Sequence, residues 1–187
     1  AHYGDTPLTT GRRALVYGSM GSGKSSLIAT FPKPIFFDAD YGENEITRAG
    51  GFPVVYIYKG AAFQDLKNLL TAMLLQRDIF DPDGGPMADR LTVGVDSWTK
   101  INELMLTDIC AADGVDLEKD KPGFNQYGKL KFQQIILMAL LKELNLKRGL
   151  NVVVTALPML EGAEDEKLTQ GSGDKSYDRI VGCPNLV

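Results

Sequence analysis

The 187-residue chain is predicted to adopt an α/β fold, with a doubly wound, mainly parallel sheet flanked by helices. Two observations support this class: apolar runs of strand length alternate with segments of helical periodicity, and a glycine-rich motif joins the first run to the first helix. The expected strands are residues 13–17, 33–40, 54–58, 91–96 and 151–156.

The first two helices are predicted from local signals. Residues 25–31 can form a short helix that stops at Pro32, because proline cannot continue a helix. After the third strand, apolar residues recur with the i, i+3, i+4, i+7, i+8 spacing of an amphipathic helix. We expect that stripe to be part of the core; its members are Leu66, Leu69, Leu70, Met73 and Leu74.

Two longer helices are expected in the second half. The first carries Ile101, Leu104, Met105 and Ile109. The second runs from about residue 126 to 148 and closes with Lys147, Arg148 and Gly149, a typical helix ending. Its expected buried residues include Leu130, Ile135, Met138, Leu141 and Leu144.

The remaining segments lack a period. Residues 81–86 and 113–125 are expected to be loops, residues 161–176 are polar, and residues 177–181 are a candidate for a further strand. No internal repeat or domain boundary is evident. We therefore expect a single domain over residues 1–187.

Composition narrows the class of function. A net charge of −4 and a pI near 5.0 argue against coating nucleic acid through bulk electrostatics, so any such contact would be local. There is neither a long apolar span nor a signal-peptide pattern, and a cytoplasmic location is expected. Cys110, Cys183 and His2 are too scattered to suggest zinc or a disulfide, so a metal would use oxygen ligands.

The most specific motif fits G-x-x-x-x-G-K-[ST] at every fixed position. It predicts a phosphate-binding loop, because glycines let successive N–H groups turn toward a phosphate at a helix N-terminus. Lys24 would reach the β- and γ-phosphates, and the Ser25 hydroxyl would bind Mg²⁺. The expected nucleotide-binding residues are Gly18, Ser19, Met20, Gly21, Ser22, Gly23, Lys24, Ser25 and Ser26.

A second metal ligand is expected at the end of a buried strand, where ligands bind in open α/β sheets. Asp96 fits this position best, and its alternative role is capping the helix that follows. Three subclasses of P-loop protein, namely AAA+ motors, GTPases and small-molecule kinases, are disfavoured but not excluded by the sequence. Ser97 follows Asp96 at the position where AAA+ motors typically have Glu. The Asn-Lys-x-Asp motif by which GTPases recognise the base is not found. The seven arginines are scattered along the chain and do not resemble the arginine-rich lid of a small-molecule kinase.

The order of motifs resembles the RecA/RadA-type recombination ATPases, and more closely the short phage-encoded RecA-core proteins thought to assist single-strand annealing. The likeness covers roughly residues 12–182. It rests on four segments. The phosphate loop is the first, and residues 36–40 resemble the second strand of that family. Residues 93–97, an apolar run that ends in Asp-Ser, resemble the strand that binds Mg²⁺, and residues 152–156 resemble the strand that senses the γ-phosphate. It implies a RecA-like P-loop NTPase that uses ATP and Mg²⁺, located in the host cytoplasm if the chain is phage-encoded.

The resemblance also assigns roles. Asp40 would activate the attacking water, although the family usually has Glu there, and Glu43 is a substitute candidate. Thr155 would sense the γ-phosphate, but Ala156 and Leu157 follow it where the family usually has a polar group.

Partners follow from the same resemblance. Loops 113–125 and 158–176 would contact single-stranded DNA, with exposed surface loops as the alternative. Lys175 or Arg179 could reach the γ-phosphate of a neighbouring copy in a homo-oligomer, and Tyr41 could stack on adenine.

The expected function is therefore a Mg²⁺-dependent ATPase acting in DNA recombination or annealing. Two alternatives stay open: a P-loop phosphotransferase with a small-molecule acceptor, and a non-hydrolysing module in which nucleotide sets assembly.

Overall fold

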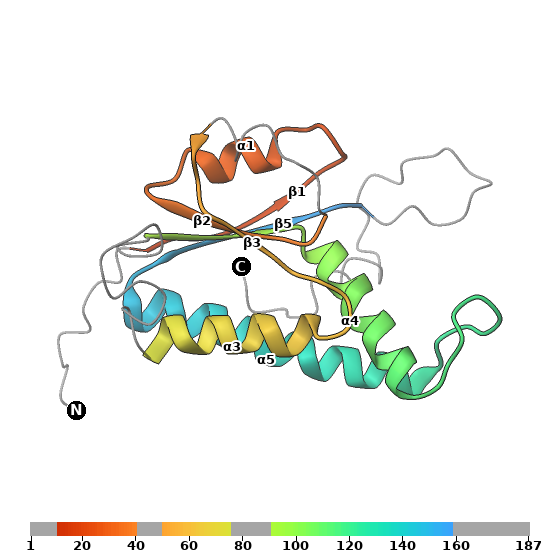
Figure 1. The fold of residues 1–187 in the computed structure, drawn as a ribbon. Coiled ribbons are helices and arrows are strands. Elements are labelled where there is room, and N and C mark those ends of the chain that lie inside the picture. Colours follow the sequence, from red (N-terminus) through yellow and green to blue (C-terminus); the bar gives the residue numbers. More distant parts are fainter. Residues whose placement is uncertain (1–10, 41–49, 76–90, 159–187) are drawn as a thin grey trace, which may run out of the picture.

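The computed structural model describes residues 11–40, 50–75 and 91–158, which form a parallel sheet with helices on both faces (Figure 1). Within these residues all four strand pairings are parallel, which confirms the predicted fold class. In spatial order the strands are β1 (Arg13–Tyr17), β5 (Asn151–Ala156), β4 (Thr92–Asp96), β2 (Pro34–Asp38) and β3 (Val54–Tyr56).

The helices divide into two layers. The short helix α1 (Lys24–Ala29) lies on one face of the sheet, and three helices lie toward the other, with α3 and α5 side by side beneath it (Figure 1). Those three are α3 (Ala62–Leu75), α4 (Trp98–Ala112) and α5 (Phe124–Arg148). Crossovers on both faces are what a doubly wound sheet requires.

Most predicted boundaries agree with the structure to within two residues. Strands β1 and β5 match the expected ranges, whereas β2 and β3 each end two residues early. Helix α1 ends at Ala29, three residues before the proline that is predicted to stop it, and α5 begins two residues before the expected start. The predicted loop 81–86 and the candidate strand 177–181 lie outside the described residues.

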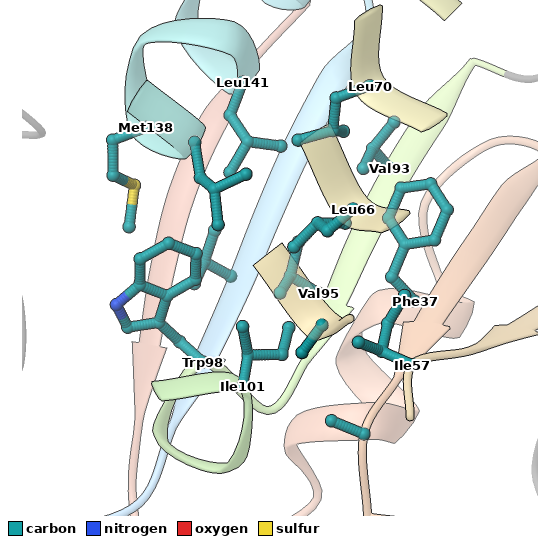
Figure 2. Packing of buried hydrophobic residues seen from close by; sticks show 14 of the residues in the cluster. Phe37, Ile57, Leu66, Leu70, Val93, Val95, Trp98, Ile101, Met138 and Leu141 are labelled. Carbon is teal, nitrogen blue, oxygen red and sulfur yellow. The ribbon is translucent and has the colours of Figure 1, made fainter. Parts of the chain in front are cut away.

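Side-chain alternation along the strands builds two cores. Ile35 and Phe37 join the cluster beneath the sheet, whereas Phe36 points to the α1 side. Figure 2 shows Phe37 in the larger cluster with Leu66 of α3 and Trp98 of α4. Burying each such side chain contributes about 1.5–3 kcal/mol, so the larger cluster fixes α3, α4 and α5 to the sheet.

The α1 side depends on a close approach between helix and sheet. Gly94 of β4 faces Ile28 of α1, and a Cβ at position 94 would lie 2.5 Å from the Ile28 Cγ2 atom. Ile28 is fully buried. The absence of a side chain at Gly94 therefore sets how closely the helix that follows the phosphate-binding motif can lie against β4.

Helix α5 corrects one prediction. Leu130, Met138, Leu141 and Leu144 are buried as expected, but Ile135 is 45% exposed. At about 100° per residue, Ile135 lies roughly 120° around the helix from Leu141, which faces the sheet. A 25-residue helix with apolar residues on more than one face does not reveal from its sequence which face packs.

Helix ends are held by specific groups. Gly149 has φ of 66° and donates its N–H to Asn145 O at 3.0 Å, which confirms the predicted end of α5. The carboxylate of Asp108 in α4 accepts the N–H groups of Gly60 and Ala62, and so caps α3 from a neighbouring helix. The two helices are thereby joined at the end of α3 that follows β3.

Candidate nucleotide-binding site

The glycine-rich motif forms the turn between β1 and α1. Gly21 and Gly23 have φ values of 76° and 84°, a conformation that side chains disfavour. Leu27 donates its N–H to Gly23 O at 3.0 Å, so the first helical bond starts from the last glycine of the loop. The local chain therefore has the turn and the following helix that a phosphate-binding loop requires.

Lys24 is the cation of this loop, and it is directed back into it. Its side chain is largely buried, and Nζ donates to Gly18 O at 2.9 Å and to Ser19 O at 2.7 Å. Backbone carbonyls thus hold the ammonium within the curve of the turn. An incoming anionic group would replace these neutral acceptors with charged ones, which make stronger hydrogen bonds.

Three side chains from three elements meet beneath the loop. Ser25 of α1 donates its hydroxyl to Asp96 Oδ2 at 2.5 Å, and Thr155 of β5 donates to Asp96 Oδ1 at 2.6 Å. Thr155 is fully buried, so its hydroxyl fixes the carboxylate from inside the sheet while Ser25 contacts it from the first turn of α1. The strand order brings them together, because β5 lies between β1 and β4.

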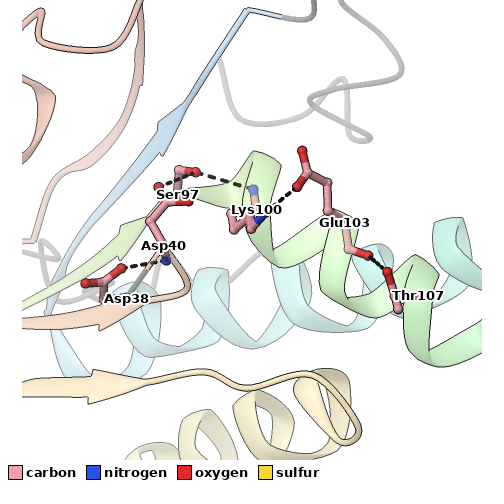
Figure 3. Close-up of polar contacts among 6 residues, drawn as sticks. All are labelled: Asp38, Asp40, Ser97, Lys100, Glu103 and Thr107. Atoms are coloured by element: carbon pink, nitrogen blue, oxygen red, sulfur yellow. Dashed lines mark hydrogen bonds and ion pairs between the residues drawn. The ribbon is translucent and has the colours of Figure 1, made fainter. Parts of the chain in front are cut away.

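The same edge of the sheet carries two further acids (Figure 3). Asp38 is the last residue of β2 and pairs in register with Asp96, and its Oδ1 accepts the N–H of Asp40 at 2.8 Å. Asp40 is exposed, and its Oδ2 accepts the hydroxyl of Ser97 at 3.4 Å. The carboxyl ends of β2 and β4 thus hold three carboxylates close together.

Burial and mutual repulsion raise the pKa values of two of these acids. Burial raises the pKa of Asp38 to about 6. The hydrogen bond from the Asp40 N–H opposes this shift, and the negative charges of Asp96 and Asp40 add to it. Burial and the charge of Asp96 also raise the pKa of Asp40, against the opposing effect of Lys100. Both carboxyl groups therefore accept protons more readily than an exposed aspartate does.

Asp38 is a residue that the sequence analysis did not assign. It lies inside the expected run 33–40, and the pattern favours Asp40 instead because that acid closes the run. The position of Asp38 as the last strand residue, beside the strand that ends in Asp96, becomes visible only when β2 and β4 are paired.

The residues around Asp96 suit a divalent cation. A serine hydroxyl and a carboxylate are oxygen donors of the kind Mg²⁺ prefers, and their oxygen atoms lie 2.5 Å apart at the base of the loop. Asp96 is half-buried rather than enclosed, so part of the residue is accessible to water. Ser25 and Asp96 are thus the residues that would hold the ion.

The helix-capping alternative for Asp96 is wrong. Ser97 is the N-cap of α4, and its hydroxyl accepts the N–H of Lys100 at 3.3 Å. The Asp96 carboxylate is directed to Ser25 and Thr155 instead.

The structure brings together only part of the predicted site. Ser25, Asp96 and Thr155 converge, Lys24 points into the adjacent loop, and Asp40, two residues after β2, contacts Ser97. Several predicted residues lie outside the described part of the chain, namely Tyr41, Glu43, Lys175, Arg179 and all of the loop 158–176 except its first residue.

A parallel sheet with a phosphate-binding loop at the carboxyl edge defines an α/β P-loop nucleotide-binding protein. The model of a family described as an AAA domain matches residues 10–183, and the chain belongs to that family. It is therefore an AAA-type P-loop NTPase. A search of curated proteins gave no match.

The match shows an AAA-type P-loop NTPase, and the narrower resemblance to RecA-type annealing proteins stays a proposal. Ser97 in place of Glu distinguishes the chain from typical AAA+ motors, but it does not set aside an AAA-type protein. Within residues 11–40, 50–75 and 91–158, no helix has the length and apolar character needed to span a bilayer.

Proposed function

We propose that the chain is a Mg²⁺-dependent ATPase that acts in DNA recombination or single-strand annealing. The observation that carries the ATPase part is the contact between Ser25 and Asp96, 71 residues apart, directly beneath the phosphate-binding loop. A hydroxyl from the first turn of α1 and a carboxylate from a buried strand form the pair of ligands that P-loop NTPases use for the metal.

The loop residues would bind and orient the triphosphate. Backbone N–H groups of residues 18–26 would surround the phosphates, and Lys24 would leave Gly18 O and Ser19 O for phosphate oxygens. Bound Mg²⁺ would neutralise charge on the β- and γ-phosphates. Thr155 keeps the Asp96 carboxylate in place through its 2.6 Å hydrogen bond, so its predicted sensor role would act through that acid.

The two acids at the end of β2 are the candidates for orienting the attacking water. Asp40 is exposed and Asp38 is 8% exposed, so water can reach Asp40 more easily. The raised pKa of Asp40 suits a group that accepts a proton during attack. We assign activation of the water to Asp40, and to Asp38 the role of positioning Asp40 through its backbone N–H. Glu43 stays a candidate for the same role and lies outside the described residues.

The role in recombination rests on the resemblance to RecA-type proteins. The loop before α5 is exposed, as expected of a DNA-contacting segment, but only residues 113–123 belong to it because α5 begins at Phe124. The loop carries four acids and two lysines, a poor match for phosphate.

Release of phosphate from Mg·ATP, with and without single-stranded DNA, tests this function. Lys24→Ala is the inactive comparison, and Lys147→Ala, a lysine paired with Glu143 near the end of α5, is the matched control. Hydrolysis that requires Lys24 and rises with DNA is expected. A rate indifferent to DNA would remove the recombination role.

Two other results would support the alternatives instead. ADP formation that requires a small-molecule acceptor would indicate a phosphotransferase. ATP binding without phosphate release, together with a change in light scattering, would indicate a nucleotide-gated assembly module.

A further inference from the structure

Helix α5 has a second apolar face on its solvent side. Three aromatic residues in its first nine positions are exposed: Phe124 by 95%, Tyr127 by 52% and Phe132 by 65%. Ile135 continues the same side and is 45% exposed. We call these four residues the aromatic face. The core contacts of α5 use other positions, so the packing of the domain does not explain why large apolar groups are placed in water.

The stretch of α5 that carries the aromatic face has a positive charge. From Phe124 to Lys142 the helix contains three lysines and no Asp or Glu, in a chain whose net charge is −4. Lys131 is exposed and lies one helical turn before Ile135 and one turn after Tyr127, so it shares their side of the helix. The local charge is therefore opposite in sign to that of the whole chain.

The acids of the preceding loop are partly neutralised. Lys129 donates to both carboxylate oxygens of Asp113, at 2.5 and 2.8 Å, and Gln126 donates to Asp113 at 2.9 Å. These hydrogen bonds lower the pKa of Asp113. Asp116 pairs with Lys119 at 2.8 Å. Two of the loop acids are thus held in ion pairs, while α5 keeps an exposed lysine among its aromatic residues.

Exposed aromatic rings combined with lysines and free of acids match one class of ligand. Single-stranded nucleic acid presents the faces of its bases for stacking and its phosphates for ion pairing, whereas a duplex hides the base faces. A protein partner would be served by any large apolar side chain and would not require an acid-free helix. Charge complementarity therefore favours the polyanion.

We propose that the aromatic face and Lys131 form a binding surface for single-stranded DNA. The inference rests on the proposed role in recombination, and it moves the DNA contact from the acidic loop to the outer side of α5. Bases stack on Phe124, Tyr127 and Phe132, and the ammonium group of Lys131 binds phosphate.

Fluorescence anisotropy of a labelled oligo(dT) with the full chain and Mg²⁺, with and without a non-hydrolysable ATP analogue, tests the surface. Phe132→Ala and Phe124→Ala should each weaken binding about tenfold, within the range for one base–aromatic stack. Leu75→Ala, which removes a side chain that is 69% exposed on α3, is the control and should leave affinity unchanged.

Phe132→Leu separates stacking from apolar docking. Leucine keeps a large apolar group but has no ring, so binding should weaken nearly as much as in Phe132→Ala. Affinity for oligo(dT) retained in Phe132→Leu and lost in Phe132→Ala would contradict stacking and indicate an apolar contact, such as one with a second copy of the chain.

The salt dependence of oligo(dT) binding tests the proposed contact between Lys131 and phosphate. Lys131→Gln should lower the slope of log affinity against log salt by about 0.7, the value for one phosphate contact on a single strand. Lys147→Gln is the matched control, because Lys147 is paired with Glu143 at 2.7 Å, and should not change the slope.

The outcomes distinguish this inference from the proposed function. Oligo(dT) binding by the unaltered chain that no α5 variant weakens would overturn the surface and leave the DNA role intact. Absence of any binding would overturn both, while phosphate release would still report on the ATPase. Basal phosphate release without DNA should be equal in all α5 variants, which shows that they fold.

Discussion

The hydroxyl of Ser25 and the carboxylate of Asp96 are joined by a hydrogen bond of 2.5 Å, although 71 residues separate them. Ser25 belongs to the helix that follows the glycine-rich loop, and Asp96 ends a central strand. A second hydroxyl, that of Thr155, fixes the other carboxylate oxygen. Both oxygens of one carboxylate are therefore held by hydroxyl groups from different elements.

Asp96→Asn should remove the Mg²⁺-dependent part of ATP affinity. The amide cannot supply the negative oxygen that a hard cation prefers, so ATP should bind equally with Mg²⁺ and with EDTA. Titration calorimetry in both buffers measures the ratio. Asp65→Asn, which alters an exposed acid in the first turn of α3, is the control. A normal Mg²⁺ effect in Asp96→Asn would exclude this carboxylate as the ligand.

Thr155→Val should weaken the apparent Mg²⁺ affinity roughly tenfold. Valine preserves the shape of threonine but leaves Asp96 Oδ1 without its donor, and a hydrogen bond to a charged group is worth about 1.5–3 kcal/mol. Thr155→Ser keeps the hydroxyl and should restore most of the affinity. Equal losses in the serine and valine variants would show that packing, not the hydrogen bond, is responsible.

Asp40→Asn should lower hydrolysis at saturating ATP by about 100-fold or more, with ATP affinity nearly unchanged, because loss of a general base affects the chemical step. Asp38→Asn should lower it less, since the amide oxygen introduced at position 38 can still accept the Asp40 N–H. Single-turnover phosphate release separates binding from chemistry. If Asp38→Asn has the larger effect, the roles of the two acids are exchanged.

The metal-free protein should lose stability as pH rises from about 4 to about 6, through Asp38. Its folded pKa is about 6 against an ordinary value of 3.8, so the folded state holds the proton more tightly and ionisation disfavours it. The effect is roughly 1–3 kcal/mol and levels off above the folded pKa.

Urea unfolding in EDTA, compared between the unaltered chain and Asp38→Asn, isolates this effect from other titrating groups. The difference in unfolding free energy should grow across that pH interval in favour of the variant. A constant difference between about pH 4 and pH 7, an interval that spans the raised pKa, would contradict it.

Gly94→Ala should destabilise the fold by about 1–3 kcal/mol, because the new Cβ would overlap Ile28 Cγ2 and overpack the α1 side. Ile28→Ala alone should also cost stability by leaving a cavity. The double variant should be more stable than the sum of the two losses predicts, since each change relieves the other. Additive losses in urea unfolding would show that the two positions are not in contact.

Local sequence was sufficient for the strands and the loop. Residues 13–17 and 151–156 are found where predicted, because an apolar run of strand length between turn signals has few alternatives. The turn at Gly21 and Gly23 follows from glycine spacing alone. The loop motif likewise specifies Lys24 and Ser25 without any tertiary information.

Contacts between distant segments were decided by the tertiary structure. The place of β5 between β1 and β4 brings Thr155 to Asp96, and the pairing of β2 with β4 brings Asp38 to the same edge. The exposure of Ile135 depends on which side of α5 meets the sheet. Sequence determined the elements and the loop because these depend on neighbours along the chain. Strand order, the buried acid and the exposed face of α5 depend on packing between elements, which only the folded chain defines.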